Sequence, residues 1–138
     1  MGYDSSNIFA KILRSEIPCH KIYEDEHALA FMDVMPMADG HCLVVPKAAS
    51  RGLLDAAPET LLYVMPVVQK VARAVVKAMA ADGFQLRQYN ESAGGQTVFH
   101  LHFHIIPMKE GVPLRPHTGQ MADHAVLAAQ ATRIKAAL

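Results

Sequence analysis

Three histidines recur at alternate positions, His100, His102 and His104, with a single apolar residue between neighbours. Such alternation predicts a strand with one apolar face, whose other face carries the three imidazoles about 7 Å apart. The unperturbed pKa of imidazole is about 6.5, so its neutral form is available as a nucleophile towards phosphorus at neutral pH. The spacing therefore predicts a strand that collects nucleophilic groups on one face.

Zinc binding and ordinary surface exposure are the alternative interpretations of these histidines. Ligands about 2.0–2.1 Å from a zinc ion hold their nitrogens within about 3.5 Å of one another. The first and third histidines of a straight strand stand about 13 Å apart, so three do not easily share one ion. A site built from His100, His102 and the distant His41 stays open. The preceding segment 94–97 favours chemistry over a plain surface, because its backbone N–H groups and the hydroxyl of Thr97 suit an oxyanion.

Composition narrows the class of protein. A length of 138 residues fits a single domain, residues 1–138, that can bury a core of its own. Thirteen basic residues balance thirteen acidic ones without a basic block, so a nucleic acid is not the expected partner. Cys19 and Cys42 form neither a CxxC pair nor a disulfide framework, which favours a reducing cytoplasm. No basic-then-apolar leader and no run of about 20 apolar residues is present, so we expect neither export nor a membrane partner.

The elements that must position the histidines follow from hydrophobic spacing and turn residues. Short strands are predicted at 21–24, 28–33 and 41–45, and a further strand at 84–90 leads through a glycine turn into the histidine strand as a hairpin. Helices are predicted at 7–14, 58–81 and 123–138. The interior Pro66 should bend the long helix or remove one hydrogen bond from it. Its apolar stripe is expected to be core: Leu61, Met65, Val68, Ala72, Val75 and Met79. The fold class is α+β.

The segment from His100 to Ile106 resembles the His-φ-His-φ-His-φ-φ signature of the histidine triad (HIT) family of nucleotide hydrolases and transferases. Six further segments are similar to the family in the same order: 8–12, 16–18, 23–25, 30–33, 40–47 and 90–100. The resemblance covers residues 7–108, leaves 109–138 as a C-terminal extension, and is closest to the nucleoside phosphoramidases. It implies a HIT-like fold with an antiparallel sheet of about five strands.

The resemblance also implies a catalytic set. His102 would attack the α-phosphorus and carry a transient nucleotidyl group, flanked by His100 and His104. His104 would contact phosphate oxygens, and His41 would support His102 from a neighbouring strand. Thr97 stands where the family commonly has serine, and its hydroxyl would donate a proton to the leaving group.

A second implied set binds the substrate. Gly95 and Gln96 would lie near the phosphate, Asn90 would contact the phosphate or the ribose region, and Asp33 would bind the ribose. The positions implied to line the base pocket are Ile8, Phe9, Ile12, Ile17, Phe31 and Val34. By residue type alone, most of these apolar side chains would instead be core, and Asp33 would be a turn residue.

This sequence departs from the family pattern at several positions, which limits the family properties that the resemblance can assign to it. Many bacterial members hold a zinc ion through two cysteines of the first helix and two later histidines. In this chain, Asn7 and Ala10 stand at the two cysteine positions, and Ala49 stands at one of the two histidine positions. Of the four zinc ligands only His100 remains, so we expect no metal and no other cofactor. Relatives that transfer nucleotidyl groups carry glutamine at the third triad position. His104 is present here, which favours hydrolysis.

These observations predict a cytoplasmic hydrolase that cleaves the α-phosphorus bond of purine nucleoside phosphoramidates or acyl adenylates and releases a nucleoside monophosphate. A dinucleoside polyphosphate hydrolase, or a nucleotide-binding regulatory protein with weak catalysis, are the alternatives. The resemblance further implies a homodimer, for which an exposed sheet edge gives a physical reason.

Overall fold

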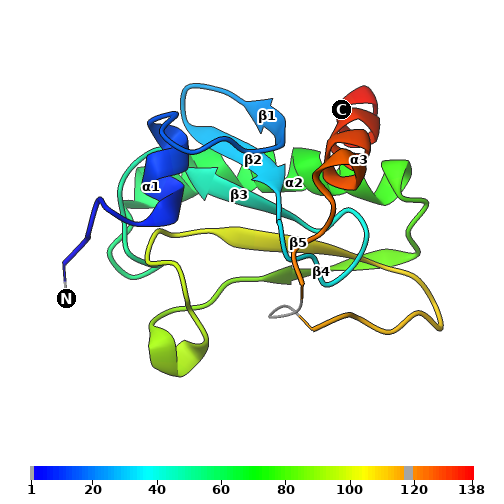
Figure 1. The fold of residues 1–138 in the computed structure, drawn as a ribbon. Helices are drawn as coiled ribbons and strands as arrows, with labels where there is room; N and C mark the ends of the chain where they lie inside the picture. The colour runs from blue at the N-terminus through cyan, green and yellow to red at the C-terminus, as the bar shows by residue number, and fades with distance from the viewer. Residues whose placement is uncertain (1, 117–119) are drawn as a thin grey trace.

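A five-stranded antiparallel sheet in the order β1-β2-β3-β5-β4 forms the centre of the computed structural model, which describes residues 2–116 and 120–138 (Figure 1). The strands are β1 (Lys21–Glu24), β2 (Ala28–Met32), β3 (Cys42–Pro46), β4 (Gly83–Arg87) and β5 (Phe103–Met108). The helices are α1 (Ile8–Leu13), α2 (Pro58–Ala78) and α3 (His124–Ala136), with a short 3-10 turn η1 (Ser92–Gly94). The expected α+β class and the hairpin of β4 with β5 are confirmed.

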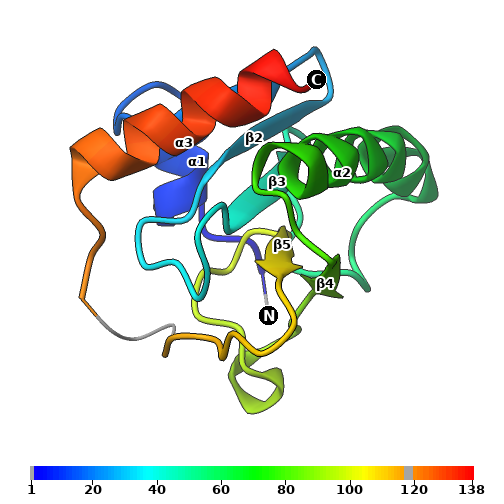
Figure 2. The ribbon, with the colours of Figure 1, turned by 90° about the vertical axis from the view of Figure 1, so that its right-hand side faces the viewer.

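The two faces of the sheet are covered by different helices. On one face, α2 and α3 pack side by side, and their buried side chains form the main core with Val44, Phe103 and Ile105 of the sheet (Figure 2). On the other face, Phe9 of α1 packs on Phe31 and a smaller apolar cluster. Alternate residues of a strand point to opposite faces of the sheet, and both faces are covered here. β2 and β3 are therefore buried along their whole lengths.

Side-chain caps fix where the two shorter helices begin. The Asn7 carboxamide accepts a hydrogen bond from the Ala10 amide, and the Asp123 carboxylate accepts one from the Ala125 amide. Both satisfy N–H groups that the first helical turn leaves unpaired. The helix predicted in the C-terminal extension is confirmed. In the described part of the chain, no helix is long and apolar enough to cross a membrane.

The predicted stripe of α2 is partly wrong. Val68, Ala72, Val75 and Met79 are buried as expected, but Met65 is 39% exposed. The buried side is instead set by valines and alanines between these positions, namely Val64, Val67, Val71 and Ala74. The helix runs through Pro66 without a break and ends at Ala78.

The histidine strand begins later than its alternation predicts. His100 and His102 precede β5, which starts at Phe103, so His104 is the triad member inside the sheet. Continued pairing with β3 would place Leu101 opposite Pro46, which has no N–H to donate. The Pro46 carbonyl accepts a hydrogen bond from the His100 ring, and the Leu101 amide donates to the Ser50 carbonyl instead. The strand prediction was therefore wrong over its first half, although the apolar residues face the core as expected.

Candidate active site

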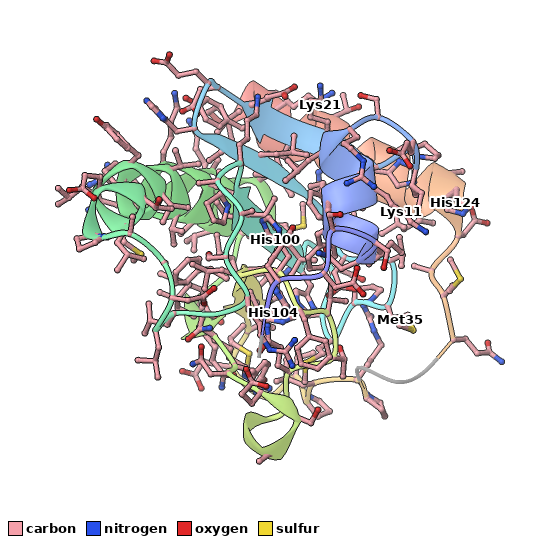
Figure 3. The ribbon with its side chains drawn as sticks, turned by 90° about the vertical axis from the view of Figure 1, so that its left-hand side faces the viewer. Lys11, Lys21, Met35, His100, His104 and His124 are labelled. Atoms are coloured by element: carbon pink, nitrogen blue, oxygen red, sulfur yellow. The ribbon has the colours of Figure 1, made fainter. Side chains whose placement is uncertain are left out.

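His104, the third histidine of the triad, belongs to a row of residues that pair across the sheet. Phe31 of β2 pairs with Leu43 of β3, Leu43 with His104 of β5, and His104 with Arg87 of β4. Residues directly opposite in antiparallel strands share a face, so all four project to the side covered by α1. Figure 3 shows His100 and His104 below α1, whereas His124 lies apart at the start of α3.

His102 has one ring nitrogen committed to the backbone. Its Nδ1 lies 2.7 Å from the carbonyl oxygen of His100, and because a carbonyl only accepts, Nδ1 carries the proton. In the neutral ring the lone pair then resides on Nε2. The edge of the ring meets Phe9 of α1 at 4.8 Å and His104 at 5.0 Å between centroids. The contacts hold a nucleophilic nitrogen in one orientation.

His41 and His104 form a second chain of hydrogen bonds. The Met37 amide donates to Nδ1 of His41 at 3.0 Å, so the proton of this ring is on Nε2. His41 Nε2 lies 2.9 Å from Nδ1 of His104, to which it donates. A neutral His104 must therefore carry its own proton on Nε2. A backbone amide thus sets the tautomers of two buried imidazoles in succession.

Asp33 completes a cluster that resembles a metal site. One of its carboxylate oxygens lies 3.4 Å from Nε2 of His41 and 3.8 Å from Nδ1 of His104, and the other accepts from the Met35 amide. All three side chains are buried, and their ligand atoms lie within 4.8 Å of one another. These spacings would accept a divalent ion. However, the Met37 amide already places a proton on the His41 nitrogen that would have to bind the ion, so hydrogen bonding explains the cluster.

His100 is oriented at both ring nitrogens. Nε2 donates to the Pro46 carbonyl at 2.8 Å, and Nδ1 lies 2.6 Å from the Tyr3 hydroxyl, which donates to it. Burial lowers the pKa of His100 from its ordinary value, and the hydrogen bond to Pro46 opposes this only in part. The ring is therefore held in its neutral form.

The triad is buried, which contradicts the interpretation of these residues as ordinary surface histidines. His100, His102 and His104 are only 1%, 5% and 5% exposed. A cavity at the other end of β5, near Met79 and Met108, contains none of them. The triad instead adjoins α1, through the contact of His102 with Phe9, and the loop that precedes His100.

That loop is organised by Gln96. Its side chain is 3% exposed, accepts from the Glu91 amide at 2.8 Å and donates to the Arg51 and Val98 carbonyls. The Arg51 guanidinium in turn forms a two-pronged ion pair with the Glu91 carboxylate at 2.8 and 2.9 Å. Gly95 turns the chain at a φ of 95°, which a side chain rarely adopts. Together they fix the backbone N–H groups that precede the triad.

Comparison with known proteins identifies this arrangement. Residues 14–111 match the model of the HIT domain family, and the segment includes His41 and all three triad histidines. The chain belongs to the HIT family. The resemblance drawn from the sequence is thereby confirmed.

Individual relatives agree with this assignment. The HIT protein is 41% identical to adenylylsulfatase HINT3 of Arabidopsis thaliana over 103 residues, which are 75% of this chain and 52% of that protein. It is 39% identical to adenosine 5'-monophosphoramidase HNT1 of Saccharomyces cerevisiae over 107 residues, 78% of this chain and 65% of the yeast protein. The chain therefore matches about half and about two thirds of these two curated relatives, and the predicted kinship with the phosphoramidase branch is confirmed.

A solved structure extends the match over nearly the whole fold. The HIT protein superposes with a TM-score of 0.93 and 52% identity on a Hit-like protein from Bartonella henselae, covering 99% of this chain and 100% of that chain. That protein is described as involved in cell-cycle regulation, and its crystal contains an unknown ligand. The HIT-like fold is confirmed, including the C-terminal extension beyond the family match.

The zinc site of some HIT proteins does not fit this chain. Asn7 uses its carboxamide oxygen to cap α1, and Ala10 and Ala49 offer no ligand atom. Both ring nitrogens of the remaining candidate, His100, are already hydrogen-bonded. The donor set would lack the thiolates that such a site needs.

The residues implied to bind the base are divided between the two faces of the sheet. Phe9, Phe31 and Ile12 lie together in the apolar cluster beneath α1, next to His102. Val34 packs against the main core. Ile8 is 46% exposed, and Ile17 is half-buried. The cluster near α1 is the part of the predicted pocket that adjoins the triad.

The remaining implied residues surround the loop before His100. Thr97 is exposed. The Asn90 carboxamide accepts from the Leu53 amide and exchanges hydrogen bonds with Gln88, so it braces the loop. Asp33 faces His41 and His104 rather than standing alone in a turn.

Sequence reasoning missed Tyr3 and the pair of Arg51 with Glu91. Tyr3 lies outside every similar segment, and a single tyrosine carries no pattern. Arg51 and Glu91 are forty residues apart, and an ion pair at that separation leaves no periodic signal. The positive φ of Glu91, 62°, could not be anticipated either, since it is not a glycine.

Proposed function

We propose that this protein hydrolyses purine nucleoside phosphoramidates or acyl adenylates at the α-phosphorus and releases a nucleoside monophosphate. The observation that carries the proposal is the bond from Nδ1 of His102 to the His100 carbonyl, which places the lone pair of the neutral ring on Nε2. Relatives named as an adenylylsulfatase and an adenosine 5'-monophosphoramidase support the coarser statement, a hydrolase acting on nucleotides.

The reaction would proceed by two displacements at phosphorus. Nε2 of His102 attacks, an N–P bond forms, and the bond from phosphorus to the leaving group breaks. The departing amine takes up a proton through the Thr97 hydroxyl, which regains one from solvent. Water then attacks phosphorus and releases a proton to solvent, the N–P bond breaks with its electron pair returning to Nε2 of His102, and the monophosphate leaves. Two easier displacements replace one difficult step.

The hydrogen-bond chain through His41 would supply the electrostatic part of catalysis. It leaves Nε2 of His104 as a donor, suited to phosphate oxygens whose charge grows in the transition state. The backbone N–H groups near Gly95 would add further donors. Because the bonds that orient them form within the protein, these donors are in place before substrate arrives.

Replacement of His102 by alanine tests the proposal. The variant should fold, retain binding of adenosine monophosphate, and lose turnover of an adenosine phosphoramidate by at least about 10³-fold, because the covalent route is gone. His124→Ala is the matched control, since this histidine contacts His20 away from the triad. Turnover by His102→Ala close to that of the parent protein would refute the nucleophile.

The leaving group needs a separate measurement. Release of adenosine monophosphate should be compared for an adenosine phosphoramidate, an acyl adenylate and a diadenosine polyphosphate at equal concentrations. We expect the first two to be preferred. A higher kcat/KM for the dinucleotide would reassign the protein as a dinucleoside polyphosphate hydrolase. Tight nucleotide binding without turnover of any substrate would favour a regulatory protein.

We also propose that the protein is a homodimer. β4 is an edge strand, and its outward side chains Phe84 and Leu86 are 45% and 44% exposed. On α2, Leu62 and Tyr63 are 73% and 51% exposed, so the helix also carries exposed apolar side chains. Free strand edges and exposed apolar patches favour association. Light scattering should give twice the mass of one chain, and a monomeric mass would contradict this proposal.

A further inference from the structure

The segment before α1 reaches the triad, although no role has been assigned to it so far. Tyr3 is half-buried, and its ring meets the ring of His100 edge-on at 5.6 Å between centroids. Its hydroxyl oxygen lies 2.6 Å from Nδ1 of His100. Figure 3 shows the chain running from α1 across the region of His100 and His104. A residue near the start of the chain thus contacts a ring nearly a hundred positions away.

This contact is built into the local structure. The Asp4 carboxylate accepts hydrogen bonds from the amide and hydroxyl of Ser6, and the Asn7 side chain donates to the Asp4 carbonyl at 2.8 Å. The Arg14 guanidinium at the end of α1 donates to the Ser5 carbonyl at 2.9 Å. These bonds tie the turn before the helix to both helix ends. The position of Tyr3 is therefore fixed by α1.

The bond from Tyr3 determines what the rest of His100 can do. With Nε2 donating to Pro46, Nδ1 has no proton and requires a donor, which the phenol supplies. The same residue presents its carbonyl to Nδ1 of His102 at 2.7 Å. His100 and His102 precede the hydrogen-bonded ladder of β5, so this carbonyl is held by the neighbouring bond from the Leu101 amide to the Ser50 carbonyl and by the contacts of the His100 side chain. Tyr3 supplies one of them.

We infer that Tyr3 is a positioning residue, whose hydroxyl fixes His100 and, through the His100 carbonyl, the orientation of the nucleophile His102. Phe9, six residues further on, presses on the His102 ring itself. The segment before α1 and α1 itself therefore carry one contact each to the two triad members that lie outside the sheet. The inference rests on the proposed function where it concerns turnover, and on geometry alone where it concerns the rings.

Tyr3→Phe is the informative variant, because it keeps the ring contact and removes only the hydroxyl. Tyr23→Phe is the matched control: its hydroxyl donates to Asp25 at 3.0 Å, within the hairpin of β1 and β2. Imidazole ¹⁵N resonances of the nucleotide-free full chain should show Nδ1 of His100 shifted in Tyr3→Phe and unchanged in the control. The Nδ1 proton of His102 should exchange faster with solvent in Tyr3→Phe alone.

Kinetics provide the second measurement. In Tyr3→Phe, kcat for an adenosine phosphoramidate should fall about tenfold, as expected for one lost hydrogen bond, while KM stays within about twofold. Unchanged His100 resonances would overturn the Tyr3 contact, and altered resonances with unchanged His102 exchange and kcat would overturn its positioning role. If the parent protein itself lacks turnover, the proposed function fails, and the resonances of His100 and His102 still decide the inference.

Discussion

His41 makes two hydrogen bonds, and two conservative substitutions of this residue should each remove a different one. His41 accepts from the Met37 amide through Nδ1 and donates to His104 through Nε2. In His41→Asn, the carboxamide oxygen can replace Nδ1, but the shorter side chain does not reach His104. In His41→Gln, the terminal amide can donate to His104, but no acceptor remains for the Met37 amide. Each variant thus removes one of the two bonds.

The sizes of the two losses follow from what each bond does. In His41→Asn, His104 loses the donor that fixes its tautomer, so kcat should fall about tenfold or more for a bond of about 1.4 kcal/mol. The gap left at this fully buried position should cost about 1 kcal/mol of stability. In His41→Gln, the amide without its acceptor should cost about 1–3 kcal/mol, with kcat closer to the parent value.

The assay is a comparison of both variants in two experiments. Urea unfolding followed by circular dichroism gives the free energy of unfolding, and steady-state release of adenosine monophosphate gives kcat. We expect His41→Asn to be the slower enzyme and His41→Gln the less stable protein. If His41→Gln is as slow as His41→Asn, the donor to His104 is not what His41 contributes, and the assignment of tautomers is refuted.

Three further outcomes are expected. Glu91→Gly should unfold at a higher temperature than Glu91→Ala in a calorimetric scan. Both variants lose the ion pair with Arg51, but only glycine relieves the backbone strain of a φ of 62° at position 91. The reverse order of unfolding temperatures would contradict backbone strain at this position. Leu101→Ala should lower the free energy of unfolding by about 2–5 kcal/mol in urea, since the side chain is fully buried; a loss under about 1 kcal/mol would show that the site collapses. Burial lowers the pKa of His100 in the folded protein, so the unfolded chain binds more protons at this residue. The free energy of unfolding should therefore fall as the pH drops below about 6.5, by up to about 1.4 kcal/mol per pH unit. His100→Gln should flatten this slope, and an unchanged slope would assign the pH dependence to other groups.

The faces of the elements could be predicted better than their ends. Alternation correctly assigned Phe103 and Ile105 to the core and His104 to the other side, because it reports side-chain direction. It did not locate the start of β5, because that depends on whether the partner strand can continue the ladder. Pro46, far away in sequence, decides this. The error at Met65 is an exception, because it concerns a face: the buried side of α2 is set by residues one position before the predicted stripe, namely Val64, Val67, Val71 and Ala74.

The sequence proposes the site as a set of residues, but it does not reveal the hydrogen bonds that join them. The motif and the spacing pointed to His102 and its neighbours, and the missing cysteines argued against a zinc ion that would hold His100. What does hold it, the Tyr3 hydroxyl, lies in a segment without a motif. The tautomers depend on the Met37 amide and the Pro46 carbonyl, and backbone groups of this kind leave no trace in residue identity.

The boundary of β5 divides the triad into parts of unequal local stability. His104 lies in a strand paired on both sides, so exposing it requires the sheet to open. His100 and His102 lie in the segment before that strand, which can detach at a lower free energy than global unfolding. Amide hydrogen exchange should accordingly be faster at 98–102 than at 103–107. On heating, the protein should lose the ordered position of His102, its proposed nucleophile, while the sheet is still intact, so inactivation should occur at a lower temperature than unfolding.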